Sequence, residues 1–168
     1  MRAVLLMTLV ALSSAAPVAP ARPQTFDAQA RALDGDTVAV DFRLLGVDAF
    51  ERRQLCQRVS GCWQCGKVAQ DFAASALRSK TATIKLTPSS SYGRPVATVT
   101  VDGRDLGERM IRAGLAVPAV QYLRSDPQRA ARYQSAFAQA KAARAGAFTG
   151  RWLEPSRWRQ GERLRCER

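Results

Sequence analysis

Two short acidic segments contain the residues of this chain whose types and spacing could do chemistry. The segments are Asp34-Gly35-Asp36-Thr37 and Asp48-Ala49-Phe50-Glu51, and each adjoins an apolar run that is typical of a β-strand. If these runs pair as antiparallel strands, the start of one lies beside the end of the other, and Asp36 meets Asp48 with Glu51 nearby. Two carboxylates, a backbone carbonyl and water would then form a hard oxygen site suited to Ca²⁺ or Mg²⁺.

Two arginines near these segments could bind an anion. Arg43 lies in the apolar run that leads to Asp48, and Arg94 ends the segment Ser91-Tyr92-Gly93-Arg94. A guanidinium group presents a fork of N–H donors that matches the oxygens of a phosphate. Carboxylates that hold a metal beside such arginines indicate metal-assisted hydrolysis of a phosphodiester. The alternative is that segment 34–37 is only a turn and that both arginines are solvated.

The overall composition reduces the range of possible functions further. The 168 residues are enough for one domain, and they carry 26 Lys and Arg against 14 Asp and Glu, a formal charge of +12. Such an excess favours an anionic partner, either nucleic acid or an acidic membrane surface, with a compositional bias toward arginine and alanine as the alternative. The chain has no histidine, so every mechanism with a histidine base, nucleophile or metal ligand is excluded.

The amino terminus has the pattern of a secretory signal peptide. A charged start at Arg2 precedes a short apolar run, and Ala19-Pro20-Ala21 offers a cleavage site, with Ser14-Ala15-Ala16 as a competitor. The run is too short for a transmembrane helix, which needs about 20 residues, and an uncleaved anchor is the alternative interpretation. We therefore predict a signal peptide over residues 1–21 and a secreted or periplasmic protein with no membrane span after cleavage.

Four cysteines in an exported chain favour two disulfide bonds. Cys56, Cys62, Cys65 and Cys166 allow three pairings, and the sequence does not choose among them. We favour Cys56–Cys65 with Cys62–Cys166, because the second bond would tie the basic tail to the rest of the chain. A four-thiolate zinc site and a redox-active CxxC at 62–65 are alternatives, but the first lacks a second CxxC and the second lacks a surrounding βαβ pattern.

The periodicity of apolar residues predicts one α+β domain, which we place over residues 22–152, followed by a basic tail over residues 153–168 that is packed on or tethered to the domain. Strands that come early in a chain, with helices interleaved later, are typical of a small β-barrel that carries helices. The patterns predict strands within 24–45, 81–86 and 96–101, a loop over 88–93, and helices over 66–77, between Asp102-Gly103 and Gly114, and from Ser125 or Asp126 to Gly146.

Four motifs follow one another along the chain. They are DGDT at 34–37, RLLGVDAFE at 43–51, YGR at 92–94, and the DG to GLA segment from Asp102 to Ala116. In this order they resemble the staphylococcal nuclease family, from about Ala32 to Trp152, and the resemblance implies a five-stranded OB-fold β-barrel with about three α-helices. The chain departs from the family at Phe50, where the family usually has proline, and in the spacing of Asp36 and Arg43, which is shorter than the family's hairpin.

The resemblance implies a metal site and a catalytic base. Asp36, Asp48 and the backbone carbonyl of Ala49 match the positions that bind one Ca²⁺ ion in the family. Glu51 matches the carboxylate that acts as general base, or that positions the water, for in-line attack on phosphorus. The metal would polarise the phosphate during this attack.

The resemblance also implies residues that contact the nucleic acid. Arg43 and Arg94 match the pair that neutralises the charge developing in the transition state. Tyr92 and Tyr122 match aromatic positions near the nucleotide, and the implied products are 3′-phosphate nucleotides from DNA or RNA.

We therefore predict an exported, Ca²⁺-dependent, sugar-nonspecific nuclease that acts on DNA and/or RNA as a monomer without a stable protein partner. Its positive charge would supply affinity for phosphates regardless of sequence. The alternative is a non-catalytic OB-fold module that binds single-stranded nucleic acid or another polyanion. Asp36, Asp48 and Glu51 argue against this alternative, because carboxylates at a phosphate site repel the ligand unless a cation lies between them.

Overall fold

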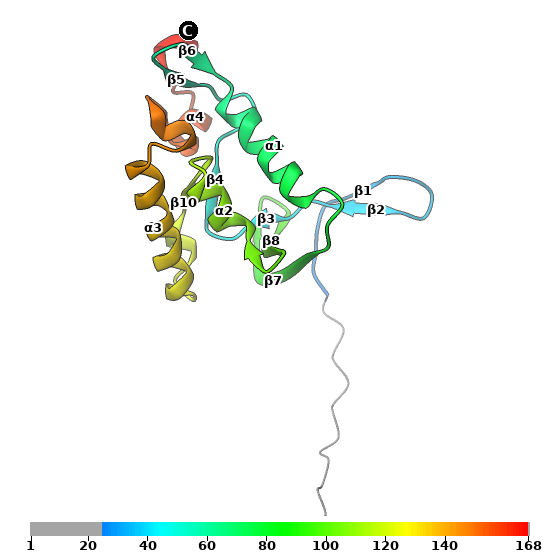
Figure 1. Cartoon of the computed structure of the whole chain (residues 1–168). Helices are drawn as coiled ribbons and strands as arrows, with labels where there is room; N and C mark the ends of the chain where they lie inside the picture. The colour runs from blue at the N-terminus through cyan, green and yellow to red at the C-terminus, as the bar shows by residue number, and fades with distance from the viewer. Residues whose placement is uncertain (1–24, 168) are drawn as a thin grey trace, which may run out of the picture.

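Residues 25–167 are described by the computed structural model, so the predicted signal peptide and its cleavage site lie outside the described residues. Within this range the chain forms a mixed α+β fold of short strands and four α-helices (Figure 1). The predicted α+β class is confirmed, whereas the number of strands and helices differs from the predicted five and three. The helices are α1 (Cys65–Leu77), α2 (Leu106–Arg112), α3 (Pro127–Ala142) and α4 (Pro155–Arg159).

The largest sheet in the described range has four strands built around β8 (Arg94–Val101). Strand β3 (Arg43–Leu44) pairs with β8 in parallel, and β7 (Ala82–Ser91) and β9 (Arg104–Asp105) pair with it in antiparallel orientation. The predicted loop over 88–93 is wrong in extent. Strand β7 continues to Ser91 past a register shift between Leu86 and Ser90, because the bulge lets the strand bend and pair again.

The remaining strands form three antiparallel pairs. They are β1 (Ala30–Ala32) with β2 (Val38–Val40), β4 (Val47–Ala49) with β10 (Ala116–Pro118), and β5 (Cys56–Arg58) with β6 (Gly61–Trp63). Three 3₁₀ helices follow β10 along the chain, at Val120–Tyr122, Gly146–Thr149 and Arg165–Glu167.

Local signals in the sequence set the helix boundaries. The carboxylate of Asp105 accepts a hydrogen bond from the N–H of Glu108 at the start of α2. The carboxylate of Asp126 does the same for the N–H of Arg129 at the start of α3. These helices were predicted, although α3 ends at Ala142, before the predicted Gly146.

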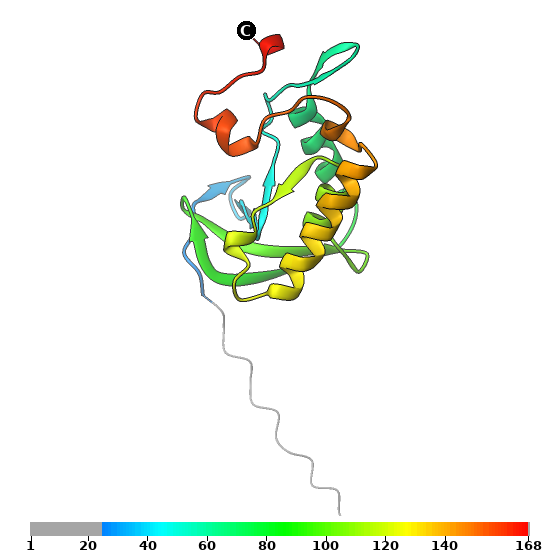
Figure 2. The same cartoon turned by 90° about the vertical axis from the view of Figure 1, so that its left-hand side faces the viewer.

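The core lies where the helices pack on the strands. Helix α2 lies between α1 and α3 and also contacts β8 and β10 (Figures 1 and 2). The fully buried side chains there include Val101, Ile111, Leu123 and Tyr133. No helix among the described residues has the length and apolar character needed to cross a bilayer.

Two disulfide bonds connect the segments that follow β4. Cys56 bonds to Cys65, and Cys62 bonds to Cys166, which is the pairing favoured from the sequence. The first bond joins β5 to the start of α1. The second spans 104 positions and joins β6 to the last 3₁₀ helix, so the end of the chain lies beside β6 (Figure 1).

Candidate functional site

Asp48 and Glu51 converge on a single cation, which is Arg159 at the end of α4. Asp48 lies on β4 opposite Val117 of β10, and Glu51 follows that strand. Arg159 Nη1 and Nη2 donate to Asp48 Oδ1 and Oδ2, each at 2.9 Å. Arg159 Nη1 also donates to Glu51 Oε1 at 2.7 Å. The guanidinium fork therefore takes both oxygens of Asp48 and one oxygen of Glu51.

This cluster is partly open to solvent. The exposed fraction of the side chain is 16% for Asp48, 37% for Glu51 and 39% for Arg159. The hydrogen bonds to Asp48, and then those to Glu51, raise the pKa of Arg159 further above its ordinary value. Arg159 consequently stays a cation at any working pH. The site is a pair of carboxylates that holds a positive group.

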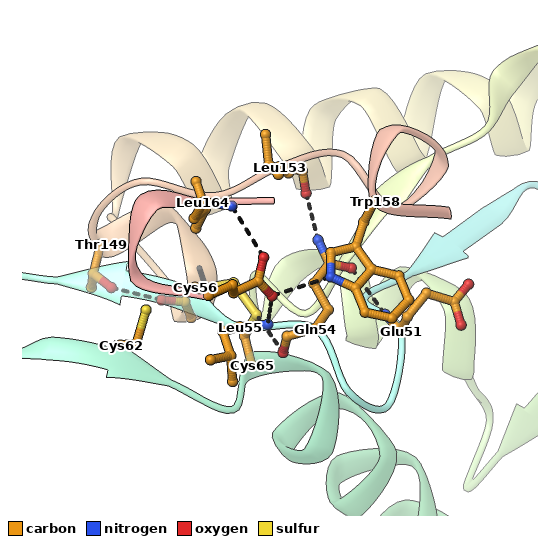
Figure 3. Close-up of a disulfide and its surroundings, with 12 residues drawn as sticks. Glu51, Gln54, Leu55, Cys56, Cys62, Cys65, Thr149, Leu153, Trp158 and Leu164 are labelled. Carbon is orange, nitrogen blue, oxygen red and sulfur yellow. Dashed lines mark hydrogen bonds between the residues drawn. A yellow bond between two sulfur atoms is a disulfide. The ribbon is translucent and has the colours of Figure 1, made fainter. Parts of the chain in front are cut away.

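A buried glutamine, which we did not identify from the sequence, fixes the backbone at Glu51. Gln54 is fully buried, and its Oε1 accepts a hydrogen bond from the Glu51 N–H at 3.1 Å. Its Nε2 donates to the carbonyl of Leu153 at 2.8 Å (Figure 3). Because an unpaired buried amide is costly, these bonds lock the Glu51 turn to the start of the C-terminal segment. Glutamine is usually exposed, so the sequence offers no signal for this role.

Phe50 anchors the same turn from the other side. Its side chain is only 3% exposed, and its ring packs edge-on against Trp152 with the centroids 5.9 Å apart. Its N–H donates to the carbonyl of Leu115 at 3.3 Å, a bond that proline could not make. In this chain core packing therefore restrains the backbone before Glu51, where the family usually relies on proline.

Arg43 and Arg94 lie on one face of the β3–β8 pair. Arg43 is opposite Val96 in the parallel register, and Val96 is two residues beyond Arg94 on β8. Residues two apart on a strand share a face, so the structure places both arginines on the same face of neighbouring strands, offset by two positions. Both are half-buried, which leaves their guanidinium groups room to meet an anion.

The two candidate aromatic residues are open to solvent. Tyr92 is 88% exposed at the turn between β7 and β8, directly before Gly93 and Arg94. Tyr122 is 68% exposed at the end of the 3₁₀ helix that follows β10. Both rings are therefore accessible to a ligand from solvent.

Asp36 lies apart from the carboxylate pair, in the loop that joins β1 to β2. The N–H of Leu33 donates to the carbonyl of Thr37 at 2.9 Å, which closes the loop. The strand pairing from which we expected Asp36 to meet Asp48 is wrong, because β2 pairs with β1, and β3 pairs with β8. Figure 1 shows this hairpin projecting on the opposite side of the molecule from α4. Segment 34–37 therefore forms the loop of the β1–β2 hairpin.

Arg159 is the second site residue that we missed. It is one of six arginines in the last 18 residues, and nothing in its spacing distinguishes it from Arg157 or Arg163. Only the tertiary position of α4, set by the Cys62–Cys166 bond and by contacts of the tail, brings it to the acidic pair.

Arg43 and Arg94 share a sheet face, and the strand that follows β3 carries Asp48 and leads to Glu51. A model described as staphylococcal nuclease homologue matches residues 41–149, and the chain belongs to this family of OB-fold, nucleic-acid-binding proteins. The predicted family is thus confirmed. The match includes Arg43, Asp48, Glu51 and Arg94, and it leaves out Asp36 and the whole of α4. No curated protein matches the chain.

Proposed function

We propose that the protein is an exported nuclease that hydrolyses phosphodiester bonds of DNA and/or RNA by in-line attack of water. The observation that carries the proposal is the family match over residues 41–149. Arg43, Glu51 and Arg94 all lie inside this segment, and the fold keeps the two arginines on neighbouring strands. These residues supply a base and two phosphate-binding forks.

Each residue has a distinct role in the proposed reaction. Glu51, whose side chain is 37% exposed, accepts the proton of the attacking water, a contribution of about 10²–10⁴-fold for general bases. Arg43 and Arg94 donate hydrogen bonds to the phosphate oxygens as negative charge grows there. Each such donor is typically worth about 3–4 kcal/mol. Tyr92 and Tyr122 stack on bases, at about 1–3 kcal/mol per base.

Calcium dependence belongs to this proposal through the family, whose nucleases typically use Ca²⁺. The described residues, as they are arranged, do not fit the ion. Asp36 is in a distant hairpin loop, both oxygens of Asp48 are bound by Arg159, and the described residues contain no cluster of three side chains able to hold a metal. Ligation by Asp36, Asp48 and the Ala49 carbonyl is therefore an expectation from the family, and we derive no catalytic step through a metal.

The proposed location is outside the cytoplasm. Two disulfide bonds are typical of proteins that fold in an oxidising compartment, and this supports the predicted signal peptide over residues 1–21. The charge of the chain supports an anionic polymer as the substrate. We propose that the exported protein acts as a monomer.

A non-catalytic module that binds single-stranded nucleic acid or another polyanion is the second candidate. The ion pairs of Arg159 favour it, because they neutralise the carboxylates that would otherwise repel a phosphate. Such a module would bind nucleic acid without cutting it.

The test measures cleavage and binding of DNA separately in a variant of Glu51. Because Arg159 contacts Glu51, the comparison is made in protein that carries Arg159→Gln. We expect Glu51→Gln to lower the rate of cleavage of single-stranded DNA at least about 100-fold while salt-dependent binding changes little. Glu154→Gln is the matched control, since this glutamate is exposed and its side chain does not cap α4. Equal loss of cutting and binding in Glu51→Gln would reject the base assignment.

A further inference from the structure

A basic cavity of about 390 Å³ lies between the turn that follows Glu51 and the first turn of α1. Three cationic side chains, one amide and one apolar side chain line it, and no carboxylate of the described residues does. A volume of this size is within the range of small-ligand sites in proteins, and its charge suits a compact anion such as a phosphate group. The lining residues are Arg52, Arg53, Leu55, Gln64 and Lys67.

The two arginines of this cavity are not used by the rest of the fold. Arg52 and Arg53 are exposed, and within residues 25–167 no carboxylate pairs with either of them. Lys67 does pair with Asp71, one turn further along α1, but both side chains of this pair are about half exposed. Such a pair contributes little, so all three cations keep their charge available to an anion from solvent.

Backbone contacts fix the position of the cavity relative to Glu51. Arg52 and Arg53 are the two central residues of a turn, which the N–H of Gln54 closes by donating to the Glu51 carbonyl at 2.7 Å. The N–H of Gly66, in the first turn of α1, donates to the carbonyl of Gln54 at 3.1 Å. Both walls of the cavity are therefore attached to the candidate base. Since consecutive Cα atoms are about 3.8 Å apart, a strand with one phosphate at Glu51 has a neighbouring phosphate within reach of these arginines.

Another arginine-rich cavity, of about 580 Å³ and lined by residues of β9, α2 and α3, shows what distinguishes the first one. Two carboxylates, those of Asp105 and Glu108, lie in the lining of this larger cavity. Asp105 pairs with Arg129 at 2.6 Å, and Glu108 pairs with Arg112 at 2.9 Å. The positive charge of the larger cavity is therefore partly neutralised within the fold, whereas that of the cavity beside Glu51 is not.

We propose that Arg52 and Arg53, with Lys67, form a subsite for a backbone phosphate of a single-stranded nucleic acid, beside the phosphate that meets Glu51. The inference rests on the proposed function for its ligand, and it requires no cleavage. All three residues lie in the segment that matches the family model. Because phosphate contacts carry no base information, the subsite adds affinity for a strand of any sequence and fixes how the strand lies along the Glu51 turn.

The salt dependence of binding tests the subsite. A fluorescent single-stranded DNA oligonucleotide is titrated with the disulfide-bonded protein in EDTA, and electrophoresis confirms that the strand stays intact. In Arg52→Gln/Arg53→Gln the affinity at low salt is expected to fall at least about tenfold. The slope of log affinity against log salt concentration should become shallower by about 1.4, since each phosphate contact on a single strand contributes about 0.7. Lys67→Gln should change the slope by about half as much.

Two further double variants control for charge and for geometry. Arg78→Gln/Arg104→Gln also removes two exposed positive charges, one from the far end of α1 and one from β9, and its slope should stay close to that of the wild type. Arg52→Lys/Arg53→Lys keeps the charge and loses the guanidinium forks, so it should keep most of the slope and recover part of the affinity. Equal losses in the two glutamine pairs would overturn the subsite.

Two other ligands identify the group that the arginines contact. An oligonucleotide with the same bases and an uncharged methylphosphonate backbone should bind equally to the wild type and to Arg52→Gln/Arg53→Gln. A loss that persists with this ligand would place the arginines on bases and overturn the proposal. Inorganic phosphate alone is titrated calorimetrically into the same proteins. If the double variant loses phosphate binding but keeps the charged oligonucleotide, the cavity takes free anions and the proposal is again overturned.

Cleavage of single-stranded DNA by the same proteins separates this inference from the proposed function. If the double variant loses binding as expected and the wild type cuts nothing, the subsite stands and the nuclease proposal fails. If the wild type cuts and Arg52→Gln/Arg53→Gln binds the strand with unchanged affinity and slope, the nuclease proposal stands and the subsite fails.

Discussion

Gly66 packs so closely against the backbone of Glu51 that a Cβ at position 66 would lie 1.6 Å from the Glu51 carbonyl oxygen. Two backbone hydrogen bonds also connect Gly66 to Glu51 through Gln54. The N–H of Gly66 donates to the carbonyl of Gln54 at 3.1 Å, and the N–H of Gln54 donates to the carbonyl of Glu51 at 2.7 Å. The first turn of α1 and the turn that carries the candidate base are therefore a single packed unit, and only glycine fits at their contact.

Gly66→Ala should break this unit. The added methyl group meets backbone atoms, which cannot rotate away, so α1 or the Glu51 turn must shift. We expect a loss of about 1–3 kcal/mol in the free energy of unfolding, measured by urea denaturation, together with slower cleavage. Gly35→Ala is the control, since nothing lies within 4 Å of a Cβ there, and its stability should stay within about 0.5 kcal/mol of the wild type. Equal effects of the two substitutions would contradict the contact.

Phe50→Ala should be among the most destabilising single changes at the site. It removes a side chain that is 3% exposed and leaves a cavity against Trp152, which typically costs about 3–5 kcal/mol. Phe50→Pro, which restores the residue usual in the family, should also destabilise the chain, because it removes the bond to the Leu115 carbonyl. A proline variant as stable as the wild type in urea would refute the anchoring role.

Arg43→Gln and Arg94→Gln should impair catalysis without unfolding the protein. Each removes one charged donor from the shared face of β3 and β8, and we expect the cleavage rate to fall about 10²–10³-fold for each. The melting temperature should change little. Lys85→Gln is the control, because it removes one positive charge from the exposed side of β7. A comparable loss of activity in this control would mean that the overall positive charge matters and not the positions of Arg43 and Arg94.

Stability should fall at alkaline pH because of Tyr133. Burial, and then the nearby Asp105, raise the pKa of Tyr133 well above its ordinary value, and its hydroxyl donates to Asp105 Oδ1 at 2.8 Å. The unfolded tyrosine ionises near pH 10 while the folded one stays protonated, so this contribution to stability is complete below pH 10 and is lost above it. Urea unfolding at pH 8 and pH 10.5 should show a larger drop for the wild type than for Tyr133→Phe. Equal losses of stability in the two proteins would rule out a raised pKa for Tyr133 in the folded protein.

Local patterns in the sequence predicted the elements whose partners are close in the chain. Apolar spacing located α1, Gly114 located the end of α2, and the cap at Ser125 or Asp126 located the start of α3. Asp36 was misplaced because strand pairing depends on which edges are free in the folded sheet. The segment before Asp34 pairs with β2, and β8 takes the edge of β3 that we assigned to β2.

The site residues that could not be predicted from the sequence are those whose roles depend on contacts between residues far apart in the chain. Gln54 meets Leu153 across 99 positions, and Arg159 meets Asp48 across 111 positions. Neither side chain is unusual where it stands, since a lone glutamine and one arginine among many are ordinary surface residues. Only the packing of the tail on the domain gives them a role.

Cleavage of a fluorescent single-stranded DNA oligonucleotide by Arg159→Gln, with and without the further change Glu51→Gln, tests the central claim most directly. The account predicts cutting by Arg159→Gln that falls at least about 100-fold when Glu51→Gln is added. Salt-sensitive binding of the oligonucleotide without any cutting, in Ca²⁺ and equally in Mg²⁺ or Mn²⁺, would contradict the account and identify a binding module.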